Sequence, residues 1–238
     1  MKFSYAIVAL LFAAPAVFAL NVDLSITKIF TVDATYFAYN DSGLGHFDLE
    51  LFNSGSLPYI AQIRIDIYNS TDRVFTAWSD KRQMAPGSHE PFREYWSPAS
   101  SGQYTARLRA YYGGEILEQE MNFTASALSG ADEFNITETK AYGNLVKFDI
   151  ASPKDAGMAI IIPQAPQGWV FTQGALNSST ASSAWIFYQA PANVPASINV
   201  VIASTDGRYV SQRTVQIKRE TGLSAMIIDM ISGMLGRV

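Results

Sequence analysis

The feature that most constrains the fold of this chain is a strict alternation of apolar and polar residues in short segments. In segment 60–68, Ile63, Ile65 and Ile67 alternate with polar side chains. The same period of two recurs at 22–30, 46–52 and 103–112. Because successive side chains of a strand point to opposite faces, this period predicts antiparallel sheets with one face in a core and one in water.

Turn-forming residues separate these segments, in the stretches YNDSGLG, NSGSLP, YNSTD, APGS, ASSGQ and YYGGE. About seven strands at this spacing in residues 20–125 predict an immunoglobulin-like β-sandwich. Residues 126–133 are small, polar and aperiodic, as expected of a linker. The strand pattern restarts in residues 134–220, where segments 145–151, 157–163, 168–174 and 197–204 are among those that read as strands. These residues predict a second sandwich. One distorted sandwich across the whole chain is the alternative. The aperiodic linker favours two tandem antiparallel sandwiches in an all-β protein.

The first nineteen residues have the pattern of a secretory signal peptide. Lys2 precedes an apolar stretch, and the ending Val17-Phe18-Ala19 suits cleavage after position 19. An uncleaved anchor helix is the alternative reading. Removing residues 1–19 takes away one lysine and no acid, so the net charge moves from −4 to −5. An exported protein with this charge has no basic stripe for nucleic acid.

Cysteine is absent, which excludes disulfides, thiolate nucleophiles and cysteine-based metal sites. Because small secreted eukaryotic domains usually depend on disulfides, cysteine-free export favours a microbial cell-surface protein, bacterial or archaeal.

Four landmarks in residues 21–125 carry a family resemblance: FDLELFNSGS, a strand running into an Asn-x-Gly turn; MAPGS, a Pro-Gly turn; FREYW, a strand ending on an aromatic; and SGQYTARL. In this order they resemble the CARDB domain, a cell-adhesion-related module of bacteria and archaea, and its NEW3-type and fibronectin-III-like relatives. The resemblance implies a sandwich fold and a role in surface adhesion or spacing. It implies no catalytic residue.

The sequence holds few residues suited to catalysis or metal binding. His46 and His89 each follow a turn, and no nucleophile elbow accompanies them, so both are expected to be exposed. Asp48 and Glu50 share one strand face and could act as a glycosidase pair, although such acids more often serve solubility. Neither the histidines nor the acids therefore predict an enzyme. We also expect no cofactor and no metal site.

Calcium is the one metal that the sequence leaves open. Asp33, Asn40, Asp41 and Ser42 supply hard oxygen ligands in the segment DATYFAYNDSG. No regular Asp-x-Asp spacing accompanies them, so turn capping is the favoured reading.

Aromatic residues could form platforms for carbohydrate. The candidates are Tyr36, Phe37, Tyr39, Trp78, Tyr95, Trp96, Tyr111, Tyr112, Trp169 and Phe171. Because sandwich cores use one or two tryptophans each, Trp96 and Trp185 are better read as core residues. Of the pair Tyr111-Tyr112, one ring is expected to face solvent.

Five Asn-x-Ser/Thr sequons are possible glycosylation sites, at Asn40, Asn69, Asn122, Asn135 and Asn177.

The chain ends on residues 221–238, where an apolar stripe predicts a short amphipathic helix. Its apolar residues are Leu223, Met226, Ile227, Met230, Ile231, Met234 and Leu235. The run is too short to span a bilayer, carries Asp229 near its centre, and lacks the basic face of an interfacial helix. Packing on its own domain, docking on a partner or sister chain, and membrane contact remain open.

These features together predict an exported, non-enzymatic surface protein that acts as an adhesion, spacer or assembly module. The alternative function is carbohydrate binding, for instance of a surface polysaccharide, through exposed aromatic residues.

Overall fold

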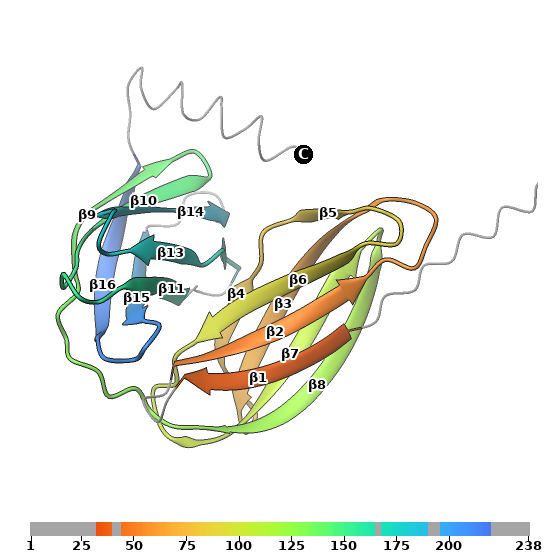
Figure 1. The fold of residues 1–238 in the computed structure, drawn as a ribbon, viewed down its shortest axis with the longest axis horizontal. Helices are drawn as coiled ribbons and strands as arrows, with labels where there is room; N and C mark the ends of the chain where they lie inside the picture. The colour runs from red at the N-terminus through yellow and green to blue at the C-terminus, as the bar shows by residue number, and fades with distance from the viewer. Residues whose placement is uncertain (1–31, 40–43, 165–167, 190–195, 220–238) are drawn as a thin grey trace, which may run out of the picture.

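The computed structural model of the protein describes residues 32–39, 44–164, 168–189 and 196–219, and every regular element in these ranges is a β-strand (Figure 1). The all-β prediction is therefore confirmed. No described segment forms a helix long and apolar enough to cross a membrane. The predicted signal peptide, the segment 22–30 and the C-terminal helix at 221–238 lie outside the described residues.

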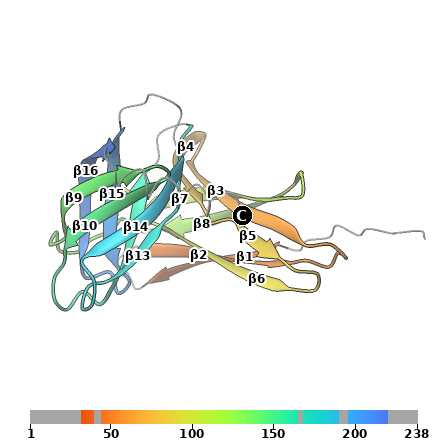
Figure 2. The same cartoon turned by 90° about the horizontal axis from the view of Figure 1, so that it is seen from above.

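The N-terminal half packs two antiparallel sheets face to face. The first has the order β1 (Val32–Tyr39), β2 (Leu44–Phe52) and β6 (His89–Trp96). The second has the order β4 (Asp72–Trp78), β3 (Tyr59–Asn69), β7 (Gly102–Tyr112) and β8 (Glu115–Ala125), with β5 (Arg82–Met84) also paired to β3. Figure 2 shows this half as two layers, which form a β-sandwich.

The apolar residues of the alternating segments fill the space between these layers. Ile63, Ile65 and Ile67 on β3 are fully buried between the layers, and the polar residues that alternate with them lie on the opposite face of the strand. The ring of Tyr36 lies 4.4 Å from that of Phe123, measured between centroids, in an aromatic cluster that also includes rings from β2, β6 and β7. Burial of apolar area on this scale is the main stabilising contribution to such a sandwich.

Strand β1 occupies much of the segment that the sequence presented as a possible calcium loop. It pairs with β2 along its whole length, from Val32 opposite Leu51 to Tyr39 opposite Leu44. Gly45 permits this pairing, because a Cβ at that position would overlap the Tyr36 ring. The loop interpretation is therefore wrong for residues 33–39.

The C-terminal half forms one eight-stranded sheet in the described residues. Its strands are β9 (Asn135–Tyr142), β10 (Leu145–Ala151), β11 (Met158–Gln164), β12 (Val170–Phe171), β13 (Gly174–Asn177), β14 (Ser183–Gln189), β15 (Ala196–Ser204) and β16 (Val210–Arg219). The order in the sheet is β12-β14-β10-β9-β16-β15-β11-β13, antiparallel except for β9 and β16, which pair in parallel.

This sheet rolls onto itself. Strands β12 and β13 stand at its two ends, yet only Thr172 and Gln173 separate them in the chain. Two residues span only about 10 Å, so the two edges must approach each other. The rolled sheet encloses a second apolar core that includes Phe134, Phe148 and Ile161.

The two halves meet through the outer surface of β11 and β15. On β11, Ala159 and Ile161 face the C-terminal core, whereas Ile160 and Ile162 belong to the apolar cluster of the N-terminal sandwich. Residues Val201 and Ala203 of β15 join the same cluster. Both faces of β11 are buried, which explains its uninterrupted apolar sequence. We call this contact the joint.

Candidate interaction surface on the five-stranded sheet

The outer face of the five-stranded sheet carries an ordered array of charged and aromatic side chains. The strand register sets them in rows across the sheet. One row holds Gln62, Tyr111 and Ile116; the next holds Trp78, Arg64, Arg109 and Glu118; the third holds Thr76, Asp66, Arg107 and Glu120. Side chains opposite one another in an antiparallel pair are close enough to interact directly.

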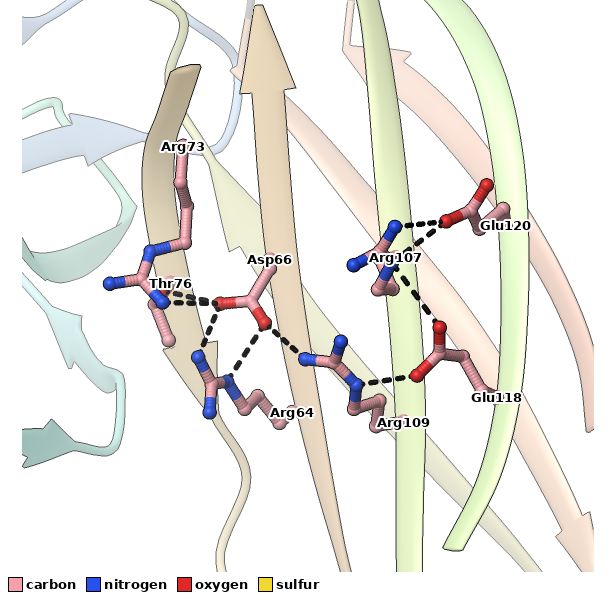
Figure 3. Close-up of polar contacts among 8 residues, drawn as sticks. All are labelled: Arg64, Asp66, Arg73, Thr76, Arg107, Arg109, Glu118 and Glu120. Carbon is pink, nitrogen blue, oxygen red and sulfur yellow. Dashed lines mark hydrogen bonds and ion pairs between the residues drawn. The ribbon is translucent and has the colours of Figure 1, made fainter. Parts of the chain in front are cut away.

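Asp66 is the centre of this array, and its side chain is completely buried. The Arg109 Nη1 donates to its Oδ2 at 2.7 Å, and the Thr76 hydroxyl donates to its Oδ1 at 2.6 Å (Figure 3). Arg64 contacts both carboxylate oxygens at 2.9 Å. A buried charge is costly unless it is paired and hydrogen-bonded, and Asp66 satisfies both conditions.

The array continues to the edge strand β8. The Arg107 guanidinium binds Glu120 at 2.6 Å and Glu118 at 3.3 Å, and Arg109 Nε donates to Glu118 at 2.6 Å (Figure 3). Because arginines and acids alternate in these pairs, the charges neutralise one another across the face.

One end of the face is apolar instead. The Trp78 and Tyr111 rings stack with centroids 5.6 Å apart, and the Arg64 guanidinium lies 5.3 Å from the Trp78 ring centre. Next to Tyr111, Ile116 is 58% exposed, and Ile60 on β3 is 50% exposed. We call Ile60, Trp78, Tyr111 and Ile116 the aromatic patch. Exposed apolar side chains gathered in this way are typical of contact surfaces.

The opposite outer face, on β2 and β6, holds the two predicted acids. Asp48 binds Arg93 through two hydrogen bonds of 2.6 and 2.7 Å, which lower the pKa of Asp48. Glu50 contacts His89 at 2.9 Å. Both acids line an open groove of about 610 Å³.

The two histidines differ in their exposure. His89 is exposed, as expected. His46 is only 6% exposed, so its expected exposure is wrong. It lies within β2 instead of a turn, between the rings of Phe37 and Tyr95, and burial lowers its pKa.

The predicted aromatic platforms divide between core and surface. Tyr36, Trp169 and Phe171 point into the cores, and burial raises the pKa of Tyr36 to about 12. Trp96 is buried at 3% exposure, which confirms its core role. The expectation for Trp185 is wrong, because it is 48% exposed on β14.

The structure describes only some of the remaining aromatic, glycosylation and calcium candidates. Phe37 is exposed, Tyr95 and Tyr111 are half-buried, and Tyr112 is buried, so the Tyr111-Tyr112 pair does place one ring toward solvent. Asn69, Asn122, Asn135 and Asn177 are all exposed. The side chains of Asp33 and Tyr39 lie outside the described part, as do Asn40, Asp41, Ser42 and the apolar residues of the C-terminal stripe.

Among the described residues, no group of three or more acidic or histidine side chains is arranged to hold a metal ion.

Sequence reasoning did not identify the array around Asp66, although the signal for its outer part was present. The turn at Gly113-Gly114 sets the register of β7 and β8, which brings Arg109 opposite Glu118 and Arg107 opposite Glu120. No sequence signal indicated that Asp66 on β3 would contact Arg109 on β7, because these two strands are distant in the chain.

No model of a known protein family matches the chain, and no curated protein sequence matches it. Among solved structures, the crystal structure of red sea bream transglutaminase is similar to 82% of this chain, with a TM-score of 0.34 and 8% sequence identity. The match covers 32% of that chain, so this protein spans about a third of the transglutaminase. A likeness at this level carries no argument about activity.

Proposed function

We propose that this chain is an exported, non-enzymatic protein of a microbial cell surface, acting as an adhesion, spacer or assembly module. The observation that carries the proposal is the aromatic patch, where Ile60 and Ile116 are at least half exposed beside the Trp78–Tyr111 stack. In this proposal the patch contacts a protein partner, and the self-neutralised charges beside it limit non-specific attraction.

The shape of the molecule supports a spacer role. Two β-structured halves share apolar side chains across the joint, which favours one body over two freely hinged ones. We extend the proposal to the tandem immunoglobulin-like arrangement and to a CARDB-like first half, both of which suit surface modules.

Retention of the full-length protein on its native cells tests the proposal. Ile116→Lys places a charge in the aromatic patch and should shift the protein from the cell surface to the medium by about tenfold, the equivalent of about 1.4 kcal/mol. Val74→Lys is the matched control, because Val74 on β4 is 50% exposed and lies outside the patch. Equal retention of both variants would count against the patch.

Carbohydrate binding is the second candidate, and the exposed Trp185 favours it. Its ring lies 5.6 Å from that of Tyr142, measured between centroids, and the register places Lys147 beside Trp185 and Lys140 beside Lys147. Trp185 is exposed and Tyr142 is half-buried, and Lys140 and Lys147 are ion-paired with Glu138 and Asp149. The exposed tryptophan ring therefore offers a flat face on which a sugar could stack. A glycan array should show binding that Trp185→Ala abolishes and that Trp78→Ala leaves intact; an array without hits would remove this candidate.

The C-terminal stripe is a separate proposal for partner docking or self-association. Deleting residues 223–238 and measuring the mass in solution tests it. A lower oligomeric state supports docking through the stripe, whereas an unchanged state with an earlier melting transition assigns the stripe to the protein's own core.

A further inference from the structure

Glu94 occupies an inward-facing position in the N-terminal sandwich. Strand β6 buries alternate residues, so Glu94 lies between the buried rings of Phe92 and Trp96 and is only 5% exposed. In the register its neighbour on β2 is the buried Phe47. The Oε2 atom of Glu94 is buried and has no hydrogen-bond partner among the described residues. A carboxylate in such a place is expensive to ionise.

Glu94 also reaches the joint. It lines a cavity of about 180 Å³ between the two halves, together with Trp78 from β4, Ile160 from β11 and Thr172 beside β12. Glu94 therefore lies in a cavity whose walls come from both halves of the molecule.

The residue next to Glu94 makes the main polar contact across the joint. The Tyr95 N–H donates to Gln173 Oε1 at 2.6 Å, and Gln173 Nε2 donates to the Tyr95 carbonyl at 2.5 Å. Strand β6 is an edge strand, so the Gln173 side-chain amide takes the place of a neighbouring strand. A shift of β6 at Glu94 would pull directly on these two hydrogen bonds.

The charged groups around Glu94 all come from the N-terminal half. Asp80, Arg82 and Arg93 all line the same cavity, and the Arg93 guanidinium binds Asp48. The cavity residues of the C-terminal half come from β11, from β13 and from the two residues between β12 and β13, and all are uncharged: Ile160, Thr172, Gln173, Gly174 and Ala175. Burial, with a smaller contribution from Asp80, raises the pKa of Glu94 to about 8, although Arg82 opposes the change.

We propose that Glu94 acts as a proton-dependent latch, which holds the two halves together while protonated and loosens the joint when it ionises. Ionisation charges a carboxyl whose Oε2 atom is buried without a hydrogen-bond partner, and separation of β6 from the segment carrying Gln173 would expose that atom to water. The latch does not depend on the partner surface proposed above.

The direction of the pH effect follows from linkage. The pKa of Glu94 is about 8 in the folded protein and close to the ordinary glutamate value when unfolded. Between these two values the folded state binds more protons than the unfolded state. Stability therefore falls as pH rises through this window and is fully present below it.

Hydrogen exchange of the Tyr95 amide in the full-length protein tests the latch. Protection factors, which correct for the intrinsic pH dependence of exchange, would be measured between about pH 6.5 and about pH 9.5. Relative to amides of β7, the Tyr95 protection should fall by about tenfold or more across this range. In Glu94→Gln, which keeps the shape but cannot ionise, it should stay level.

Two further variants complete the design. Glu90→Gln makes the same chemical change on the same strand outside the cavity lining, and it should follow the wild-type profile. Gln173→Ala should show low Tyr95 protection at every pH. The same fall in Glu94→Gln as in wild type, or a level profile in wild type, would overturn the latch.

Discussion

At the scale of single residues, Asp66 is the residue around which the charged array on the outer face of the five-stranded sheet is built. Replacing it with Asn keeps the shape but leaves Arg64 and Arg109 without their shared charge. Removing one partner of a buried pair is strongly destabilising, and the arginines here are partly exposed, which moderates the loss. Asp66→Asn should lower the free energy of unfolding by about 2–4 kcal/mol in urea denaturation.

The control for Asp66 is Glu120→Gln at the exposed end of the same array, where solvent screens the pair. It should leave the unfolding midpoint almost unchanged. Similar losses in the two variants would show that burial of Asp66 is not the cause.

Gly130 tests the packing of the segment between the halves. A Cβ there would lie 2.8 Å from the Val210 backbone nitrogen and 2.9 Å from the Gly207 carbonyl oxygen, and neither atom can rotate away. Gly130→Ala should therefore cost about 1–3 kcal/mol, measured by thermal unfolding. Gly102→Ala, whose nearest contact would be 3.8 Å away, should be close to neutral. An equal loss in both variants would contradict this account.

Individual residues were also the hardest to place from the sequence. Trp96 and Trp185 both stand in strands, but only the former points between the layers. Glu94 stands at a position of β6 where the alternation would place an apolar residue. Because a glutamate is rarely buried, the sequence does not predict that this side chain faces the core. These positions depend on contacts between distant strands, which local periodicity does not contain.

At the scale of elements, β11 has two different tasks on its two faces. Ile161 fills the C-terminal core and Ile162 fills the joint, and both are fully or almost fully buried. Truncating either to Ala should cost about 2–5 kcal/mol. Only Ile162→Ala should also lower the hydrogen-exchange protection of the Tyr95 amide at about pH 6.5. If Ile161→Ala lowered it equally, the two faces would not be separable.

Most strands could be predicted from the sequence, because alternation and turn residues act locally. The predicted segment 145–151 matches β10, and segment 103–112 matches most of β7. Segment 168–174 was expected as one strand, but the chain crosses there between the two edges of the rolled sheet, which breaks it into β12 and β13. Sequence periodicity does not reveal such a closure.

At the scale of the whole molecule, the joint connects the fold to the proposed function. The apolar runs in segments 157–163 and 197–204 predicted strands, but not that their second faces would pack on the N-terminal sandwich. This packing favours a fixed orientation of the aromatic patch relative to the C-terminal half, as a spacer or assembly module requires.

The most direct test of the central claim is site-specific photo-crosslinking of the full-length protein on intact native cells. A photoreactive amino acid at position 116 should give a protein adduct that external protease removes, whereas the same group at position 74 should not. That result would support surface location and contact through the aromatic patch together. No adduct at position 116, equal adducts at both positions, or an adduct that external protease cannot reach would contradict the claim.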